Sequence, residues 1–204
     1  MEPNKLYNKL LTLKYTKSGD DVDWCVFIED AVYLAFQQTT SSRDWQVNFN
    51  FPVKLYKNQE SCIKVARGWG DAYKSCNDEI MQKLLVAHNE HPDLDVVICG
   101  WSYGGAMAII ASEDFYFRYK LKPSVITFGA PKPLFGYKTR KYVLSCVKHS
   151  EQFSHRSDVV TLLPPVFGYK VLNRVWIGKF NLINLFKPDI YHCVYGSESL
   201  YNNL

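Results

Sequence analysis

The sequence GWSYGG at residues 100–105 decides the fold, because it joins an apolar run at 94–99 to a helix-like run that begins at Ala106. This order predicts a strand, a sharp turn and a helix, with a serine at the apex of the turn. Glycines two positions before and after that serine allow the strand and the helix to pass close together. Such a turn presents the Ser102 hydroxyl above a sheet edge and directs the first helical amides toward the space in front of it.

The same pattern has two interpretations. Nucleotide-binding α/β proteins carry Gly and Ser at strand-to-helix turns in order to bind phosphate. A catalytic serine needs, in addition, a histidine base within hydrogen-bond reach and a carboxylate that orients the histidine. The rest of the chain has to distinguish between phosphate binding and catalysis.

Length and composition favour one domain, residues 1–204, with a substantial core. Hydrophobic residues make up 47% of the chain and charged residues 22%, and no run reaches the roughly 18 apolar residues of a membrane span. The net charge of +4 comes without clusters of Lys and Arg, so we expect no nucleic-acid partner. Six scattered cysteines favour free thiols, and the lysines that interrupt the N-terminal segment favour a cytoplasmic location.

Strand-like and helix-like segments alternate along the chain. Apolar residues at helical spacing predict helices at 6–13, at 68–91, from 106 onward and at 137–147. Short apolar runs predict strands at 24–28, 31–36, 94–99, 124–128 and 152–154, and the alternation at 166–177 suggests a hairpin that turns at 172–173. This order predicts an α/β fold, a three-layer sandwich with a mostly parallel central sheet and flanking helices.

Only one of the five histidines suits the role of base. A serine in this type of turn is followed along the chain by its carboxylate and then by its histidine. His88 and His91 precede Ser102, and His149 and His155 come too early to leave room for a carboxylate and a strand. His192, in a loop near the C-terminus, is the remaining candidate.

Two aspartates compete for the role of acid. Asp158 follows the strand-like segment 152–154, so its carboxylate would point to the same sheet edge as the serine. Asp189 lies three residues before His192, and a carboxylate so close in sequence more often caps a turn. We therefore rank Asp158 ahead of Asp189.

Four further segments, together with the serine turn, resemble the class 3 lipases, the family of fungal triacylglycerol lipases and their bacterial and plant relatives. Residues 35–45 resemble the family's oxyanion segment with its Asp/Asn-Trp pair, and residues 68–69 resemble the Gly-Phe pair that begins its next helix. Residues 127–131 resemble its Gly-x-Pro turn, and residues 158–165 resemble the segment that carries its acid. These landmarks occur in order from about residue 24 to 196. The resemblance implies an α/β-hydrolase fold.

Carried over residue by residue, the resemblance implies a catalytic triad and an oxyanion hole. Ser102 would be the nucleophile, Asp158 the acid and His192 the base, while the amides of Thr39 and Tyr103 would bind the oxyanion.

The chain also departs from the family pattern, and the departures fall where a substrate would bind. Gln37-Gln38 stands where the family usually has Arg-Gly, and Trp101-Ser102-Tyr103 where it commonly has His-Ser-Leu. We therefore expect Gln38 and Trp101 to shape the substrate pocket. Phe49 and Phe51 alternate with polar residues in place of the family's lid, which favours an extended flap that also contacts substrate.

The function implied is that of a serine carboxylic-ester hydrolase, a lipase or esterase of lipid metabolism that works through an acyl-serine intermediate. No metal and no cofactor is expected. The expected partners are a small acyl ester or lipid and, transiently, a lipid surface, with no obligate protein partner. An acyltransferase or thioesterase on the same triad is the alternative, followed by a catalytically silent lipase-like interaction module.

Overall fold

The computed structural model describes residues 1–20, 22–37, 52–57, 62–180 and 192–201. The helices are α1 (Pro3–Leu10), α3 (Arg67–Lys74), α4 (Asn77–Glu90), α5 (Tyr103–Tyr119) and α6 (Tyr137–Cys146), with 3-10 turns at Val159–Leu162 and Glu198–Leu200. The strands are β1 (Thr16–Ser18), β2 (Val22–Ile28), β3 (Val32–Phe36), β4 (Val53–Lys57), β5 (Cys62–Ala66), β6 (Val96–Trp101), β7 (Ser124–Phe128), β8 (Leu134–Phe135), β9 (His149–His155), β10 (Tyr169–Lys170) and β11 (Arg174–Ile177).

The larger of the two sheets has the strand order β1-β2-β3-β6-β7-β9-β11. Strands β3, β6, β7, β9 and β11 run parallel, and β1 and β2 are antiparallel additions at one edge. The carboxyl ends of parallel strands meet at one edge of a sheet, so the segments that follow β6, β7 and β9 converge there.

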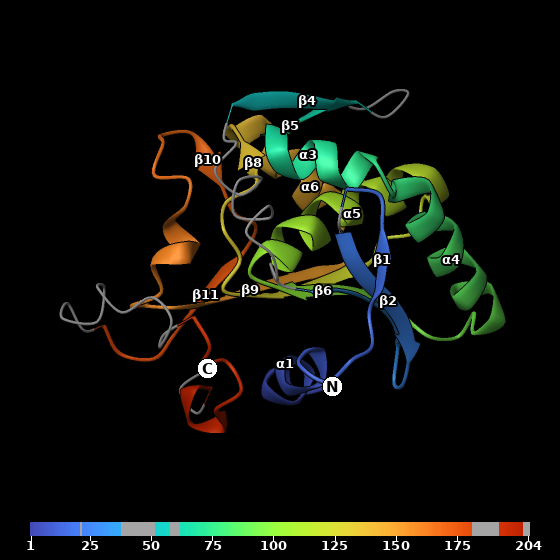
Figure 1. The fold of residues 1–204 in the computed structure, drawn as a ribbon, viewed down its shortest axis with the longest axis horizontal. Helices are drawn as coiled ribbons and strands as arrows, with labels where there is room; N and C mark the ends of the chain where they lie inside the picture. The colour runs from blue at the N-terminus through green and yellow to red at the C-terminus, as the bar shows by residue number, and fades with distance from the viewer. Residues whose placement is uncertain (21, 38–51, 58–61, 181–191, 202–204) are drawn as a thin grey trace.

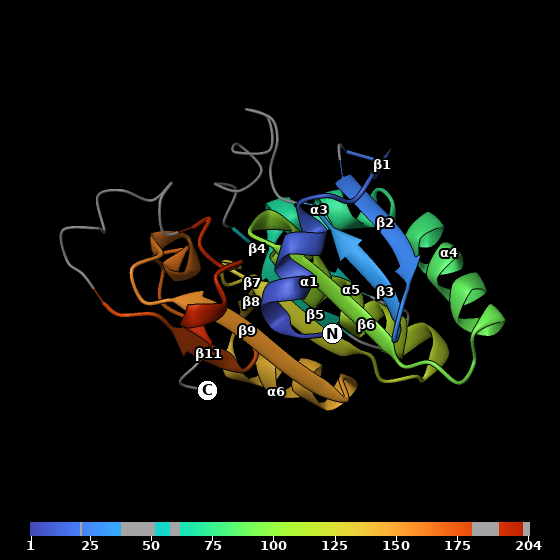
Figure 2. The same cartoon turned by 90° about the horizontal axis from the view of Figure 1, so that it is seen from below.

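Helices cover both faces of this sheet. In Figure 1, α1 lies on one side of the sheet, and α3, α4, α5 and α6 lie on the other. Figure 2 views the sheet from the side that α1 covers and shows the C-terminal 3-10 helix beside α1. The prediction of a three-layer α/β sandwich with a mostly parallel central sheet is confirmed.

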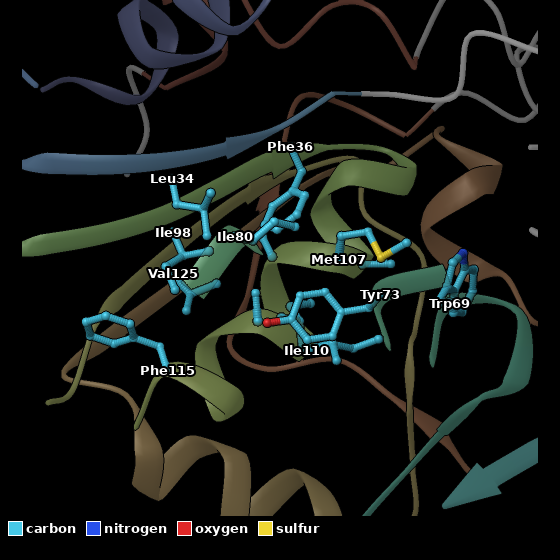
Figure 3. Close-up of a cluster of buried hydrophobic side chains, with 14 of the residues drawn as sticks. Leu34, Phe36, Trp69, Tyr73, Ile80, Ile98, Met107, Ile110, Phe115 and Val125 are labelled. Atoms are coloured by element: carbon cyan, nitrogen blue, oxygen red, sulfur yellow. The ribbon is translucent and has the colours of Figure 1, made fainter. Parts of the chain in front are cut away.

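The parallel strands are apolar on both faces because both faces are covered. Along β6, Val96 and Ile98 belong to the core under α3, α4 and α5, whereas Val97, Cys99 and Trp101 face the α1 side. Figure 3 shows the first of these cores, in which Tyr73 and Met107 lie among aliphatic side chains of the sheet and the helices.

A smaller antiparallel sheet, with the order β10-β8-β5-β4, was not expected from the sequence. Its strands β4 and β5 lie on the far side of α3 from the larger sheet (Figure 1). The hairpin predicted at 166–177 is wrong, because β10 pairs with β8 in this smaller sheet and β11 pairs in parallel with β9 in the larger one. Two strands adjacent in sequence thus belong to different sheets, which local alternation cannot show.

The long helix predicted at 68–91 is two helices. α3 ends at Lys74, and α4 begins at Asn77 with Asp78 and Glu79 in its first turn, where carboxylates favour a helix start. The predicted strands at 24–28, 31–36, 94–99, 124–128 and 152–154 and the helices at the N-terminus and at 137–147 are confirmed, with shifts of a few residues at their ends.

The five cysteines whose side chains the structure describes, Cys25, Cys76, Cys99, Cys146 and Cys193, form no disulfide with one another, as expected from the sequence. Burial raises the pKa of Cys76 to about 12, in keeping with a thiol that packs as a small hydrophobe. No helix within the described ranges combines the length and the apolar character that crossing a membrane requires.

Candidate active site

The turn between β6 and α5 holds Ser102 in a backbone conformation that non-glycine residues rarely adopt, with φ 55° and ψ −122°. Its amide donates a 2.9 Å hydrogen bond to the carbonyl of Phe128 at the end of β7, which fixes the turn to the neighbouring strand. A Cβ on Gly100 would lie 2.3 Å from the Gly104 carbonyl oxygen, so the close approach of strand and helix requires glycine. The sharp serine turn with its closely packed strand and helix, predicted from the sequence, is present, and the structure adds the strained backbone of Ser102.

Asp158 follows β9 and is nearly fully buried, with 2% of its surface exposed. Its Oδ1 accepts a 2.9 Å hydrogen bond from the amide of Val160, the second residue of the 3-10 turn Val159–Leu162. Its Oδ2 accepts a 2.6 Å hydrogen bond from the Tyr195 hydroxyl and lies 2.9 Å from His192 Nδ1. A buried carboxylate with three such partners is a fixed acceptor rather than a solvated charge.

His192 is brought to the serine turn from a distant part of the sequence. Its ring lies 5.4 Å from that of Trp101, the residue before Ser102, and its carbonyl oxygen accepts a 2.9 Å hydrogen bond from the Trp101 indole. Because a carboxylate oxygen only accepts, His192 Nδ1 carries the proton in this pair, and Nε2 is left as the basic nitrogen.

The turn after β7 makes room for this pair. Gly129 has a φ of +56°, and a Cβ there would lie 2.9 Å from Asp158 Oδ2 and 2.9 Å from His192 Cε1. Glycine at this position is therefore required both by the backbone and by the carboxylate and imidazole that pack against it. The sequence resemblance includes the Gly129-Ala130-Pro131 turn, and the structure gives the physical reason for its glycine.

The structure brings three of the sequence-predicted residues to one edge of the sheet, Ser102, Asp158 and His192, whose triad roles stay proposals. Tyr103 opens α5, so its amide is the first of that helix, and its side chain is buried in the core. The remaining predicted residues, Thr39, Gln38, Phe49 and Phe51, and the competing Asp189 lie outside the described residues.

The interpretation of Trp101 as a substrate contact needs correction. Its side chain is only 5% exposed and points to the α1 side of the sheet, where it packs edge-on against Tyr7 at a ring distance of 5.3 Å. Alternation along β6 explains the error, since the residue before the turn belongs to the strand and faces the core.

Sequence reasoning missed Tyr195. Its hydroxyl donates to Asp158 and accepts the His155 amide over 3.0 Å, and its ring is completely buried. Burial, followed by the nearby charge of Asp158, holds the pKa of Tyr195 well above its usual value, so the hydroxyl remains a donor. The one feature of the sequence that could have pointed to Tyr195 is its position three residues after His192, and without the fold that spacing does not indicate a contact with Asp158.

Comparisons with known proteins identify the family of this chain. A family model described as Lipase (class 3) matches residues 33–168. A lipase of Rhizopus niveus is 32% identical over 152 residues, which cover 69% of this chain and 37% of the relative. The secreted mono- and diacylglycerol lipase A of Penicillium cyclopium is 27% identical over 162 residues, which cover 78% of this chain and 52% of the relative.

A solved structure extends the likeness to the fold. It is that of a triacylglycerol lipase whose catalytic centre is a serine protease triad, and it matches with a TM-score of 0.71 and 25% identity over 81% of this chain and 66% of that one. The chain spans about two fifths of the length of the Rhizopus relative and about half that of the Penicillium relative.

The cytoplasmic location expected from the sequence is contradicted by these comparisons. The Penicillium relative is a secreted lipase. The expectation depended on the lysines of the N-terminal segment, and neither these lysines nor the scattered cysteines decide the location.

Proposed function

Because this chain belongs to the class 3 lipase family, we propose that it is a serine carboxylic-ester hydrolase in which Ser102 is the nucleophile, His192 the base and Asp158 the acid. One observation carries the proposal. His192 Nδ1 lies 2.9 Å from the buried Asp158 carboxylate, directly beside the strained turn that holds Ser102. A serine hydroxyl becomes a good nucleophile only with such an oriented base.

In the first step, His192 Nε2 takes the proton of the Ser102 hydroxyl while Oγ attacks the carbonyl carbon of the ester. The imidazolium that forms is stabilised by Asp158, whose other hydrogen bonds keep its carboxylate aimed at Nδ1. The imidazolium then returns the proton to the leaving alcohol, and an acyl-serine remains. Water repeats the cycle and releases the carboxylic acid.

The oxyanion of each tetrahedral intermediate would be bound by amides. The Tyr103 amide, at the positive end of the 17-residue helix α5, is the first donor. We assign the second to Thr39, with Gln38, Phe49 and Phe51 as substrate contacts.

The substrate class follows from the family. Relatives that act on mono- and diacylglycerols and triacylglycerols support an acyl ester of glycerolipid type, and the secreted relative supports an extracellular site of action. Transient contact with a lipid surface is part of the same proposal. The organisation of residues 1–204 as one domain stays a prediction.

The first test is labelling with a fluorophosphonate, which reacts covalently with activated serines. We expect the wild-type protein to be labelled and Ser102→Ala to lose all labelling. Ser145→Ala is the matched control, because Ser145 is an exposed serine on α6 whose hydroxyl donates to the Tyr142 carbonyl, and it should be labelled like the wild type. Labelling that survives in Ser102→Ala would refute the nucleophile, and an unlabelled wild type would refute the hydrolase.

A further inference from the structure

Trp101 connects the strand that carries the nucleophile to the main chain of the base. Its indole Nε1 donates a 2.9 Å hydrogen bond to the carbonyl oxygen of His192. Trp101 is only 5% exposed, so the indole end of this bond is shielded from water. Residue 101 is joined to Ser102 by a peptide bond, so the contact links two members of the proposed triad over a very short path.

We infer that Trp101 is a positioning residue, whose indole N–H holds the His192 loop in register with the serine turn. The inference rests on the proposed function and adds a residue to it. The Asp158 carboxylate fixes the imidazole from one side, but a side-chain contact alone leaves the backbone of the loop free to shift. The indole fixes that backbone at His192 itself, and near-attack geometry depends on shifts of about 1 Å or less.

The support for the indole comes from the N-terminal helix. Tyr7 of α1 packs at ring distances of 5.3 Å from Trp101, 5.4 Å from Phe128 and 5.7 Å from Tyr195. Tyr195, in turn, holds Asp158. Both α1 and the loop that carries His192 lie outside residues 33–168, the part that matches the family model, so the arrangement is visible only in the fold.

The chemistry of the ring explains how a tryptophan fits a position where class 3 lipases commonly carry histidine. In both side chains a five-membered ring places a nitrogen two bonds from Cγ, Nε1 in indole and Nε2 in imidazole. Either ring can therefore donate from the same point in space, whereas phenylalanine fills similar volume without a donor. The six-membered part of the indole adds the contact with Tyr7.

The experiment compares Trp101→Phe and Trp101→His with the wild type in hydrolysis of a soluble short-chain ester. For Trp101→Phe we expect kcat to fall about tenfold with KM within about twofold, because the lost bond misplaces the base without touching the substrate. Trp101→His should recover most of kcat. Trp24→Phe is the matched control, since Trp24 is also buried and its indole also donates one hydrogen bond, to Ser18 on the remote edge strand, and its kcat should not change.

Two results would overturn the inference: an unchanged kcat in Trp101→Phe, or a kcat in Trp101→His as low as in Trp101→Phe. An inactive, unlabelled wild type would instead refute the proposed function, so the two failures are distinguishable.

A second measurement needs no variant to be active. In the wild-type protein, the Trp101 indole proton should exchange with solvent far more slowly than that of Trp176, whose ring is 39% exposed. Proton exchange followed by NMR, with Trp101→Phe used only to assign the resonance, reports this directly. Equal exchange rates at Trp101 and Trp176 would show that the bond is absent.

Discussion

His192 and His155 both lie close to Asp158, yet their Nδ1 atoms have opposite hydrogen-bonding roles. His192 Nδ1 faces the carboxylate and carries a proton. His155 Nδ1 accepts a 3.1 Å hydrogen bond from the Ser157 amide, so it carries none. The position of His155 in the sequence argues against its being the base, and the structure adds a chemical reason. Its Nδ1 is occupied by the Ser157 amide, and its Nε2 packs against Gly178, so neither nitrogen is available to the serine.

This difference predicts how stability depends on pH. Burial lowers the pKa of His155, and the charge of Asp158 opposes that only in part. Below the ordinary histidine pKa of about 6.5, the unfolded chain binds a proton at residue 155 that the folded chain does not, so the free energy of unfolding falls as the pH falls below that value. Above about pH 6.5 the contribution is complete.

Urea unfolding of the wild type and of His155→Gln between about pH 5 and 7.5 checks this expectation. The wild-type free energy of unfolding should decrease more steeply toward low pH than that of the variant. His149→Gln changes an exposed histidine and should follow the wild-type curve. Parallel curves for the wild type and His155→Gln would contradict the prediction.

At the scale of elements, the serine turn depends on how closely α5 approaches β3. A Cβ on Gly104 would lie 2.3 Å from the Phe36 carbonyl oxygen and 2.5 Å from that of Gln37, and both are backbone atoms that cannot turn away. The first turn of α5 must therefore move if a methyl group is added. That movement would displace the Tyr103 amide and Ser102 together.

We expect Gly104→Ala to reduce the rate of fluorophosphonate labelling by about a hundredfold, comparable to the loss of an oxyanion donor. Gly136→Ala is the control. It also introduces a methyl group at a glycine, with φ +86°, but meets nothing within 4 Å and lies at the start of α6. Its labelling rate should stay at the wild-type value, whatever the cost in stability. Equal labelling of both variants would show that the close packing of α5 and β3 is unimportant for the serine.

Elements with a local signal were predicted well, and those defined by distant partners were not. The strand, turn and helix around Ser102 have a pattern that only this geometry satisfies. By contrast, the strands at 169–170 and 174–177 belong to different sheets. The first pairs with residues 134–135 and the second with residues 152–155, and neither partner can be read from the strand's own sequence. The same limit applies to the site. Asp158 and His192 could be found by type and order, but the roles of Trp101 and Tyr195 depend on contacts across the fold.

At the scale of the whole molecule, a buried polar cluster joins the helices to the smaller sheet. Asp114 of α5, with no exposed surface, accepts hydrogen bonds from the Tyr73 hydroxyl of α3 over 2.9 Å and from Arg118 Nε over 2.9 Å. Asn77 of α4 donates to Asp114 over 3.4 Å and to the Tyr56 hydroxyl of β4 over 3.0 Å. Three helices thus meet at one carboxylate, and Asn77 connects the cluster to β4.

Removing its charge should destabilise the whole fold. In Asp114→Asn the amide nitrogen must face a donor, and Arg118 loses its buried partner. We expect the free energy of unfolding to drop by about 3 kcal/mol, which for a chain of this size lowers Tm by roughly 6 to 12 °C. Thermal unfolding followed by circular dichroism measures this change.

Asp78→Asn is the matched control, because it removes the other carboxylate that pairs with Arg118. Asp78 Oδ1 lies 2.7 Å from that guanidinium, but its side chain is 88% exposed, whereas that of Asp114 is not exposed at all. Water screens the exposed pair and replaces its hydrogen bonds, so Tm should change far less in Asp78→Asn. A similar loss in both variants would mean that Arg118 itself stabilises the fold, and that Asp114 does not hold the helices and the smaller sheet together.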